Sequence, residues 1–141
     1  MHSKLVNGTL SLAIGLTILG NGTIPVHAAS WHKGTPISVQ GKWKTNWHSE
    51  EKKMPQEREL VTITRKSFNS TDQEKQPDGN TTEDIAAPNA IGASYKYLGN
   101  HTYQIKGKEL FSGTSVIKVK RYSHNKLKIS QRHFKEYLYR R

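Results

Sequence analysis

The chain has 141 residues, and its 22 lysines and arginines outnumber its 11 aspartates and glutamates, which gives a net charge of +11. It contains no cysteine, which excludes disulfide bonds and a lipid anchor attached to cysteine, so a folded domain must be stabilised by its core alone. The charge excess predicts attraction to polyanions.

The first segment is typical of a bacterial export signal. Lys4 precedes an apolar stretch, Leu10–Leu19, and Val26-His27-Ala28 then places small residues at the positions that a signal peptidase reads, so we expect the cut after Ala28 or Ala29. A membrane-spanning helix needs about 20 apolar residues, and this stretch has about half that number. We therefore expect residues 1–28 to be a signal peptide and the protein to be secreted.

Residues 29–141 are expected to form one domain with no transmembrane segment, because no second long hydrophobic run follows. Trp43 and Trp47 alternate with polar residues, which predicts a strand with both aromatic side chains on one face. We expect these two tryptophans to anchor the structural core. Residues 60–63 (LVTI) predict a second strand.

Two hairpins are predicted in the second half of the chain. The aromatic-rich runs 93–98 and 101–105 flank Gly99-Asn100, a two-residue turn signal. The run 115–122 alternates apolar residues with lysines, and after a short polar turn the same alternation resumes in residues 126–129.

Two segments are harder to interpret. Residues 132–141 fit either a strand or a helix, and we favour the strand. Residues 69–93 are polar and acidic and include two prolines, which predicts a mobile acidic loop with a short helical turn at 82–87. The pattern as a whole predicts an all-β fold: a small antiparallel barrel, lipocalin-like or shorter, or a sandwich, of about six to eight strands.

Two motifs near the start of the expected domain carry resemblances. The sequence WHKGTP at residues 31–36, followed by Gly41-x-Trp43, resembles a group of small exported proteins of lactic acid bacteria, which implies an extracellular, barrel-like β domain and no particular activity. The Gly41-x-Trp43 motif is also similar to the lipocalin signature, in which the tryptophan packs against an arginine of the last strand. That similarity implies a cation–π partner for Trp43, which could be Arg132, Arg140 or Arg141.

The charge is distributed unevenly along the chain. Residues 49–93 contain nine acids and six lysines or arginines, whereas residues 94–141 contain twelve lysines or arginines and only two acids. We therefore expect the basic half to bind an anionic polymer, and for an exported protein of a Gram-positive bacterium the nearest is the teichoic-acid-bearing cell wall. The predicted binding residues lie on neighbouring strands: Lys118, Lys120, Arg121, Lys126 and Lys128.

No sequence motif predicts catalysis, a metal site or a cofactor. The histidines lack the spacing of metal ligands. The chain has no nucleophile elbow, no phosphate-binding glycine loop and no paired carboxylates on the predicted strands. Nucleic acid is not the expected partner, because the tyrosines near the lysines are interpreted as core and hairpin residues. The leading hypothesis is a non-catalytic, extracellular or wall-associated binding protein, and the alternative is a lipocalin-like carrier of a small apolar ligand.

Overall fold

Residues 29–141, which the computed structural model describes, fold almost entirely into β-strands, and the expected signal peptide lies outside this range. Trp31–Arg141 forms one unit. Within the described range, no helix has the length and apolar character needed to cross a membrane. The elements are β1 (His32–Lys33), the 3-10 helix η3 (Ile37–Val39), β2 (Gly41–Lys44), β3 (Glu57–Ile63), β4 (Ser67–Lys75), β5 (Thr81–Gly99), β6 (Thr102–Lys108), β7 (Thr114–Ser123), β8 (Lys126–Gln131) and β9 (Phe134–Arg140).

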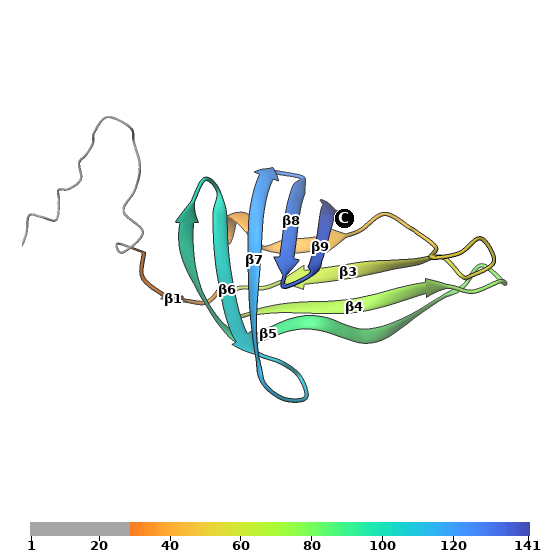
Figure 1. The fold of residues 1–141 in the computed structure, drawn as a ribbon, viewed down its shortest axis with the longest axis horizontal. Helices are drawn as coiled ribbons and strands as arrows, with labels where there is room; N and C mark the ends of the chain where they lie inside the picture. Colours follow the sequence, from red (N-terminus) through yellow and green to blue (C-terminus); the bar gives the residue numbers. More distant parts are fainter. Residues whose placement is uncertain (1–28) are drawn as a thin grey trace, which may run out of the picture. The chain divides into compact units, whose positions relative to one another are not determined.

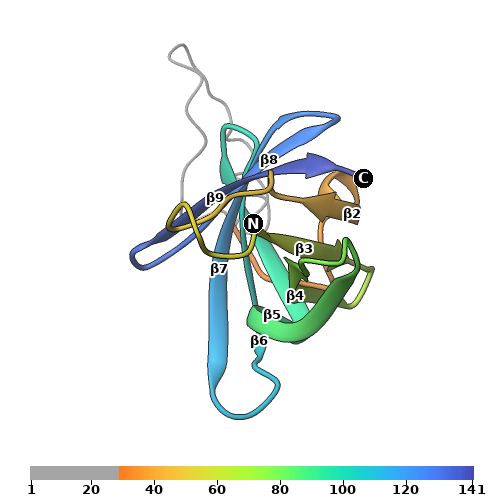
Figure 2. The same ribbon diagram turned by 90° about the vertical axis from the view of Figure 1, so that its right-hand side faces the viewer.

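The strands form a closed antiparallel barrel (Figures 1 and 2). Each of the strands from β2 to β8 pairs with the next in the chain, and β9 pairs with β2 to close the barrel. The long strand β5 makes this possible, because its first half pairs with β4 and its second half with β6. The short strand β1 pairs with β5 as a ninth strand. The predicted all-β barrel is confirmed, with eight strands in its wall.

Alternation along the strands separates a buried interior from a charged exterior. On β7, Ile117 and Val119 are fully buried, whereas Lys118 between them is exposed. On β8, Leu127 and Ile129 are fully buried in the same way. Both predicted hairpins are confirmed, and residues 134–140 form a strand as favoured above. Thirteen buried side chains make up the core: Val39, Trp43, Val61, Ile63, Phe68, Ala90, Ala93, Ile105, Ile117, Val119, Leu127, Ile129 and Leu138.

The barrel closes through a contact between its first and last strands. The guanidinium carbon of Arg140 on β9 lies 4.1 Å from the ring centroid of Trp43 on β2, which is the predicted cation–π contact. The indole Nε1 of Trp43 donates a hydrogen bond to the carbonyl of Val39, and Arg140 Nη1 donates to the carbonyl of Gln40. Gly41 is required here, because it has a φ of +135° and a Cβ would collide with Arg140.

The predicted acidic loop is wrong, because residues 69–93 lie mostly in β4 and in the first half of β5. The expected helical turn at residues 82–87 is also strand. The turn between the two strands contains Pro77-Asp78-Gly79, a typical turn sequence, and Gly79 has a φ of +91°. Residues 69–84 contain no aliphatic or aromatic side chain, and the strands here are held by backbone pairing of β4 to β3 and of β5 to β4.

Contrary to the prediction, Trp47 does not belong to the core. Strand β2 ends at Lys44, so the alternation that places Trp43 inside the barrel does not continue to Trp47. Trp47 is half-buried, and its ring lies 4.3 Å from the guanidinium of Arg58 and 5.7 Å from the ammonium of Lys75. Of the two predicted anchors, only Trp43 is a core residue.

Replacing Trp43 with alanine is expected to lower the free energy of unfolding by about 3–5 kcal/mol, because it removes a fully buried aromatic side chain. Urea denaturation followed by circular dichroism measures this loss. The matched control is Trp31→Ala, since Trp31 is 39% exposed, and it should cost less than about 1 kcal/mol. Equal losses in the two variants would contradict the role assigned to Trp43.

Candidate functional site

The outer surface of β7, β8 and β9 carries a set of lysines that we call the lysine face. Ile117 and Val119 of β7, and Leu127 and Ile129 of β8, point inward, so alternation directs the lysines between and beside them outward. Lys120 lies directly opposite Lys128 in the strand register, and Lys118 lies opposite Ser130, which itself lies opposite Lys135 of β9. The lysines of this face are Lys118, Lys120, Lys126, Lys128 and Lys135.

Tyrosine rings lie between these lysines. Tyr122 of β7 and Tyr137 of β9 are 49% and 42% exposed, and their ring centroids are 6.0 Å apart. The ammonium nitrogen of Lys126 lies 4.7 Å from the Tyr137 centroid, and that of Lys120 lies 5.2 Å from the Tyr122 centroid. Such cation–π contacts restrict the lysine side chains, so less conformational entropy is lost when they bind an anion.

A hollow of about 380 Å³ lies in the lysine face. It is lined by four lysines, by one tyrosine, and by a threonine and a serine on the two strands that flank β7. This arrangement offers ammonium and hydroxyl donors to an anionic group, and the hollow has no acidic side chain in its lining. The lining residues are Thr102, Lys118, Lys120, Tyr122, Lys128, Ser130 and Lys135.

Arg121, one of the five predicted binding residues, does not lie on this face. It follows Val119 by two positions on β7 and lies opposite Leu127, both of which are fully buried, so its side chain is directed toward the inside of the barrel. Its Nε is buried and has no hydrogen-bond partner. The structure therefore brings together four of the five predicted residues, Lys118, Lys120, Lys126 and Lys128, and separates Arg121 from them.

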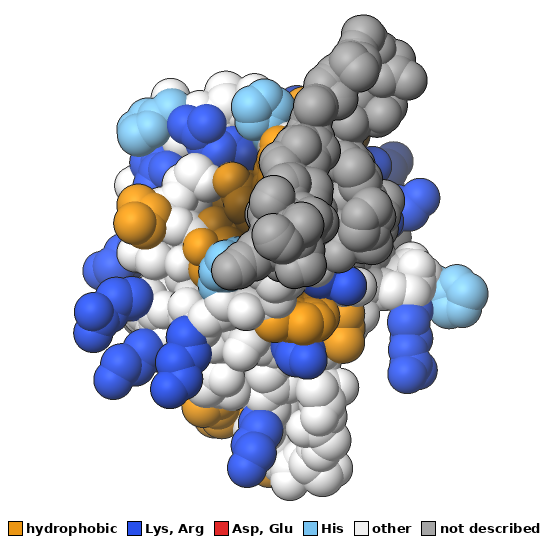
Figure 3. All heavy atoms as spheres, turned by 90° about the vertical axis from the view of Figure 1, so that its left-hand side faces the viewer, with side chains coloured by type: hydrophobic (Ala, Val, Ile, Leu, Met, Phe, Trp, Pro, Cys, Tyr) orange, Lys and Arg blue, Asp and Glu red, His pale blue; other side chains and the backbone are white. Residues whose placement is uncertain are grey.

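Positive charge continues from the lysine face across β6 to β1. Lys106 of β6 and Lys96 of β5 lie 3.9 Å and 5.0 Å from the Trp31 ring. Viewed from the side on which β1 lies, the described surface shows many lysine and arginine side chains and no acidic one (Figure 3). The two acids of the basic half lie elsewhere: Glu136 alternates inward with Leu138, and Glu109 accepts hydrogen bonds from the backbone amide of Asn89.

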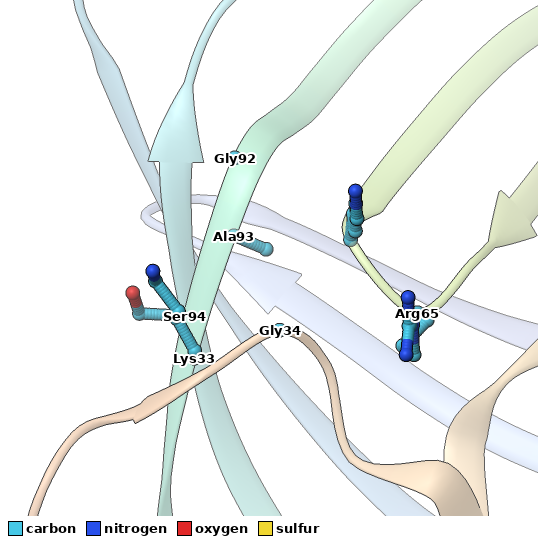
Figure 4. A pocket seen from close by; sticks show the side chains of 7 residues that line it. Lys33, Gly34, Arg65, Gly92, Ala93 and Ser94 are labelled. Atoms are coloured by element: carbon cyan, nitrogen blue, oxygen red, sulfur yellow. The ribbon is translucent and has the colours of Figure 1, made fainter.

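A second hollow, of about 520 Å³, lies where the turn between β3 and β4 meets β1 and β5. Arg65 lies across it from Lys33 and Ser94 (Figure 4). Its lining contains three cationic side chains and no acidic one: Lys33, Gly34, Arg65, Lys66, Gly92, Ala93 and Ser94. Like the lysine face, this hollow suits an anionic group.

Acidic residues gather on one face of β3, β4 and the first half of β5, which we call the acidic face. In the strand register Glu57 lies opposite Glu74, Glu59 lies opposite Asp72, and Asp72 lies opposite Asp84. Directly opposed side chains have Cβ atoms about 4.5–5.5 Å apart, and like charges at that separation destabilise a sheet. Five carboxyl groups therefore lie within reach of one another.

Glu59 is the buried member of the acidic face. It is 7% exposed, and its Oε1 has no hydrogen-bond partner. Burial, followed by the charges of Asp72 and Glu136, raises the pKa of Glu59 to about 8, although the Ser70 hydroxyl nearby lowers it in part. Burial and the charge of Asp84 also raise the pKa of Asp72, against a lowering effect of His48.

Sequence reasoning missed this site because three of its five acids, Asp72, Glu74 and Asp84, lie in a segment interpreted as a loop. A signal was present in the spacing, since Glu57 and Glu59, and also Asp72 and Glu74, lie two positions apart as on one face of a strand. In the part of the chain that the structure describes, no three histidines, aspartates or glutamates are placed to hold a metal ion.

Comparison with known proteins gives no relative from which a role could be transferred. No protein-family model, no curated protein and no solved structure matches the chain.

The raised pKa of Glu59 predicts that the free energy of unfolding falls as pH rises. Between pH 4.5 and about 8 the folded protein holds a proton on Glu59 that the unfolded chain releases, so raising the pH through this window favours unfolding. We expect Glu59→Gln to be more stable than the wild type at pH 8 by at least about 2 kcal/mol, and the difference to shrink toward pH 4.5.

Urea denaturation at several pH values tests this expectation. Glu83→Gln is the matched control, because Glu83 neighbours Asp84 on β5 and is exposed, and its carboxylate accepts a hydrogen bond from Gln73 on the other face of the sheet. The same pH dependence in the wild type and in Glu59→Gln would contradict the assignment.

Proposed function

We propose that this protein is a non-catalytic, extracellular binding protein whose lysine face holds an anionic polymer of the cell wall, such as teichoic acid. The observation that supports this most is the set of outward lysines on three neighbouring strands, around a hollow that no acidic residue lines. The barrel keeps the strands that carry these charges at fixed positions, so little backbone conformational entropy is lost when a polymer binds.

The spacing of the lysines suits a linear polymer of repeating negative charges. Residues two apart on a strand, such as Lys118 and Lys120, are about 6.8 Å apart along it, and neighbouring strands are about 4.8 Å apart. The lysine face is therefore a grid of cations a few ångströms apart, which can meet successive anionic groups of one chain. Tyr122 and Tyr137 add flat surfaces for the uncharged parts of the repeat.

Carriage of a small apolar ligand is the less supported alternative. The closed eight-stranded barrel and the contact between Trp43 and Arg140 are compatible with a lipocalin-like carrier. The thirteen buried side chains of the core, however, occupy the interior where such a ligand would lie. The two hollows described above are lined by lysine and arginine side chains, which do not suit an apolar ligand.

Reversing four charges tests the proposal. Lys118, Lys120, Lys126 and Lys128 replaced together by glutamate should weaken retention on purified cell walls at least about tenfold, because exposed ion pairs of about 0.2–1 kcal/mol each are lost and replaced by repulsion. The thermal midpoint should change little, since these side chains lie on the outer surface. Sedimentation of wall fragments with bound protein measures the retention.

The control reverses Lys52 and Lys53, two exposed lysines outside the lysine face, and should leave retention nearly unchanged. Retention by the wild type should also fall steeply as salt rises, since the screening length shortens from about 10 Å at 0.1 M to about 3 Å at 1 M. Retention that persists in 1 M salt, or that both sets of reversals weaken equally, would contradict binding through the lysine face.

A further inference from the structure

The acidic face holds like charges together, and its own strands supply no lysine or arginine to neutralise them. Along the face of β3, β4 and the first half of β5 that contains Glu59, Asp72 and Asp84, no residue of these strands is a lysine or arginine. The cations of the same strands lie on the opposite face, where Arg58 donates to Gln73 and stacks on Trp47. This arrangement destabilises the sheet in the absence of a ligand.

Glu59 adds a second and independent observation. Its side chain is more than nine-tenths buried on the same side of the sheet as Asp72, and Oε1 has no donor within hydrogen-bond distance. A buried carboxyl oxygen without a partner costs about 1–3 kcal/mol, and more when it is charged. A ligand that donates hydrogen bonds and brings positive charge would remove both costs at once.

The geometry of the acidic face favours an extended organic cation over a metal ion. Glu59, Asp72 and Asp84 lie on three successive strands about 4.8 Å apart, so the row is about 10 Å long. In residues 29–141 no three acidic or histidine side chains are placed to hold a metal ion. A chain with an ammonium group near each end can contact successive carboxylates along the row.

We propose that the acidic face is a binding site for aliphatic diamines or polyamines, in which Glu59 accepts one ammonium group and Asp72 and Asp84 accept the remainder of the cation. This site is separate from the lysine face in residues and in the sign of its charge, so either proposal can fail without the other.

Binding is expected to be linked to a proton. The raised pKa of Glu59 means that the free site is largely protonated at pH 7, so an ammonium group that pairs with Glu59 displaces a proton to the buffer. Affinity should therefore rise from pH 6 to pH 9. The other titratable groups that face Glu59 are Asp72 and Glu136, with His48 and Asp84 beside Asp72.

Isothermal titration calorimetry of the full chain tests the site with three probes that share a four-carbon chain: 1,4-diaminobutane, 1-aminobutane and 1,4-butanediol. We expect the diamine to bind most tightly, the monoamine more weakly and the neutral diol not at all. The enthalpy of diamine binding at pH 7 should differ between phosphate and Tris buffers, because a proton is released. Glu59→Gln should weaken diamine binding at least about tenfold, the loss expected for one charge-assisted hydrogen bond.

Glu83→Gln is again the control and should bind the diamine as the wild type does, because Glu83 lies on the other face of β5. If Glu59→Gln does not fold, Asp84→Asn replaces it, since Asp84 is exposed and its loss should weaken binding without unfolding the barrel. The proposal is overturned if the wild type does not bind millimolar diamine, if the diol binds equally well, if calcium chloride binds and the diamine does not, or if the Glu59 and Glu83 variants lose affinity equally.

Discussion

The closure of the barrel depends on one contact, between Trp43 and Arg140. Only two register pairs join β2 to β9, so backbone pairing alone is a weak seam between the first and last strands of the wall. Arg140 strengthens this seam by stacking on the Trp43 ring and by donating to the carbonyls of Gln40 and His124. Since a closed wall has no free edges, every other strand pair gains from this contact.

Once the wall is closed, strand alternation has to place each charged residue inside or outside. The lysines of β7 and β8 alternate with core residues and therefore lie outside, where water and an anionic partner can reach them. Acids of β3, β4 and β5 instead lie on the face of these strands that points inward, and Glu59 is therefore buried. A single chain of strongly positive net charge thus presents one cationic and one anionic surface.

These two surfaces differ in what they demand of a ligand. The lysine face is exposed and strongly hydrated, so it offers modest energy per contact, sensitivity to salt and room for a polymer that uses many contacts. The acidic face includes a desolvated carboxyl group, where each interaction is stronger and an unpaired oxygen is costly, so it suits a small ligand that fits closely. Because the two surfaces have opposite charge, a ligand that binds one of them is repelled by the other.

The sequence alone determined the all-β class, both C-terminal hairpins, the outward lysines and the place of Trp43 in the core, because strand alternation and turn residues are local signals. It did not determine which arginine meets Trp43, that Trp47 leaves the core, or that residues 69–93 pair as strands. Those outcomes depend on where the chain turns and on backbone pairing between distant segments. The surroundings of Glu59 also depend on tertiary structure, because the register of β3 against β4 places Asp72 beside it.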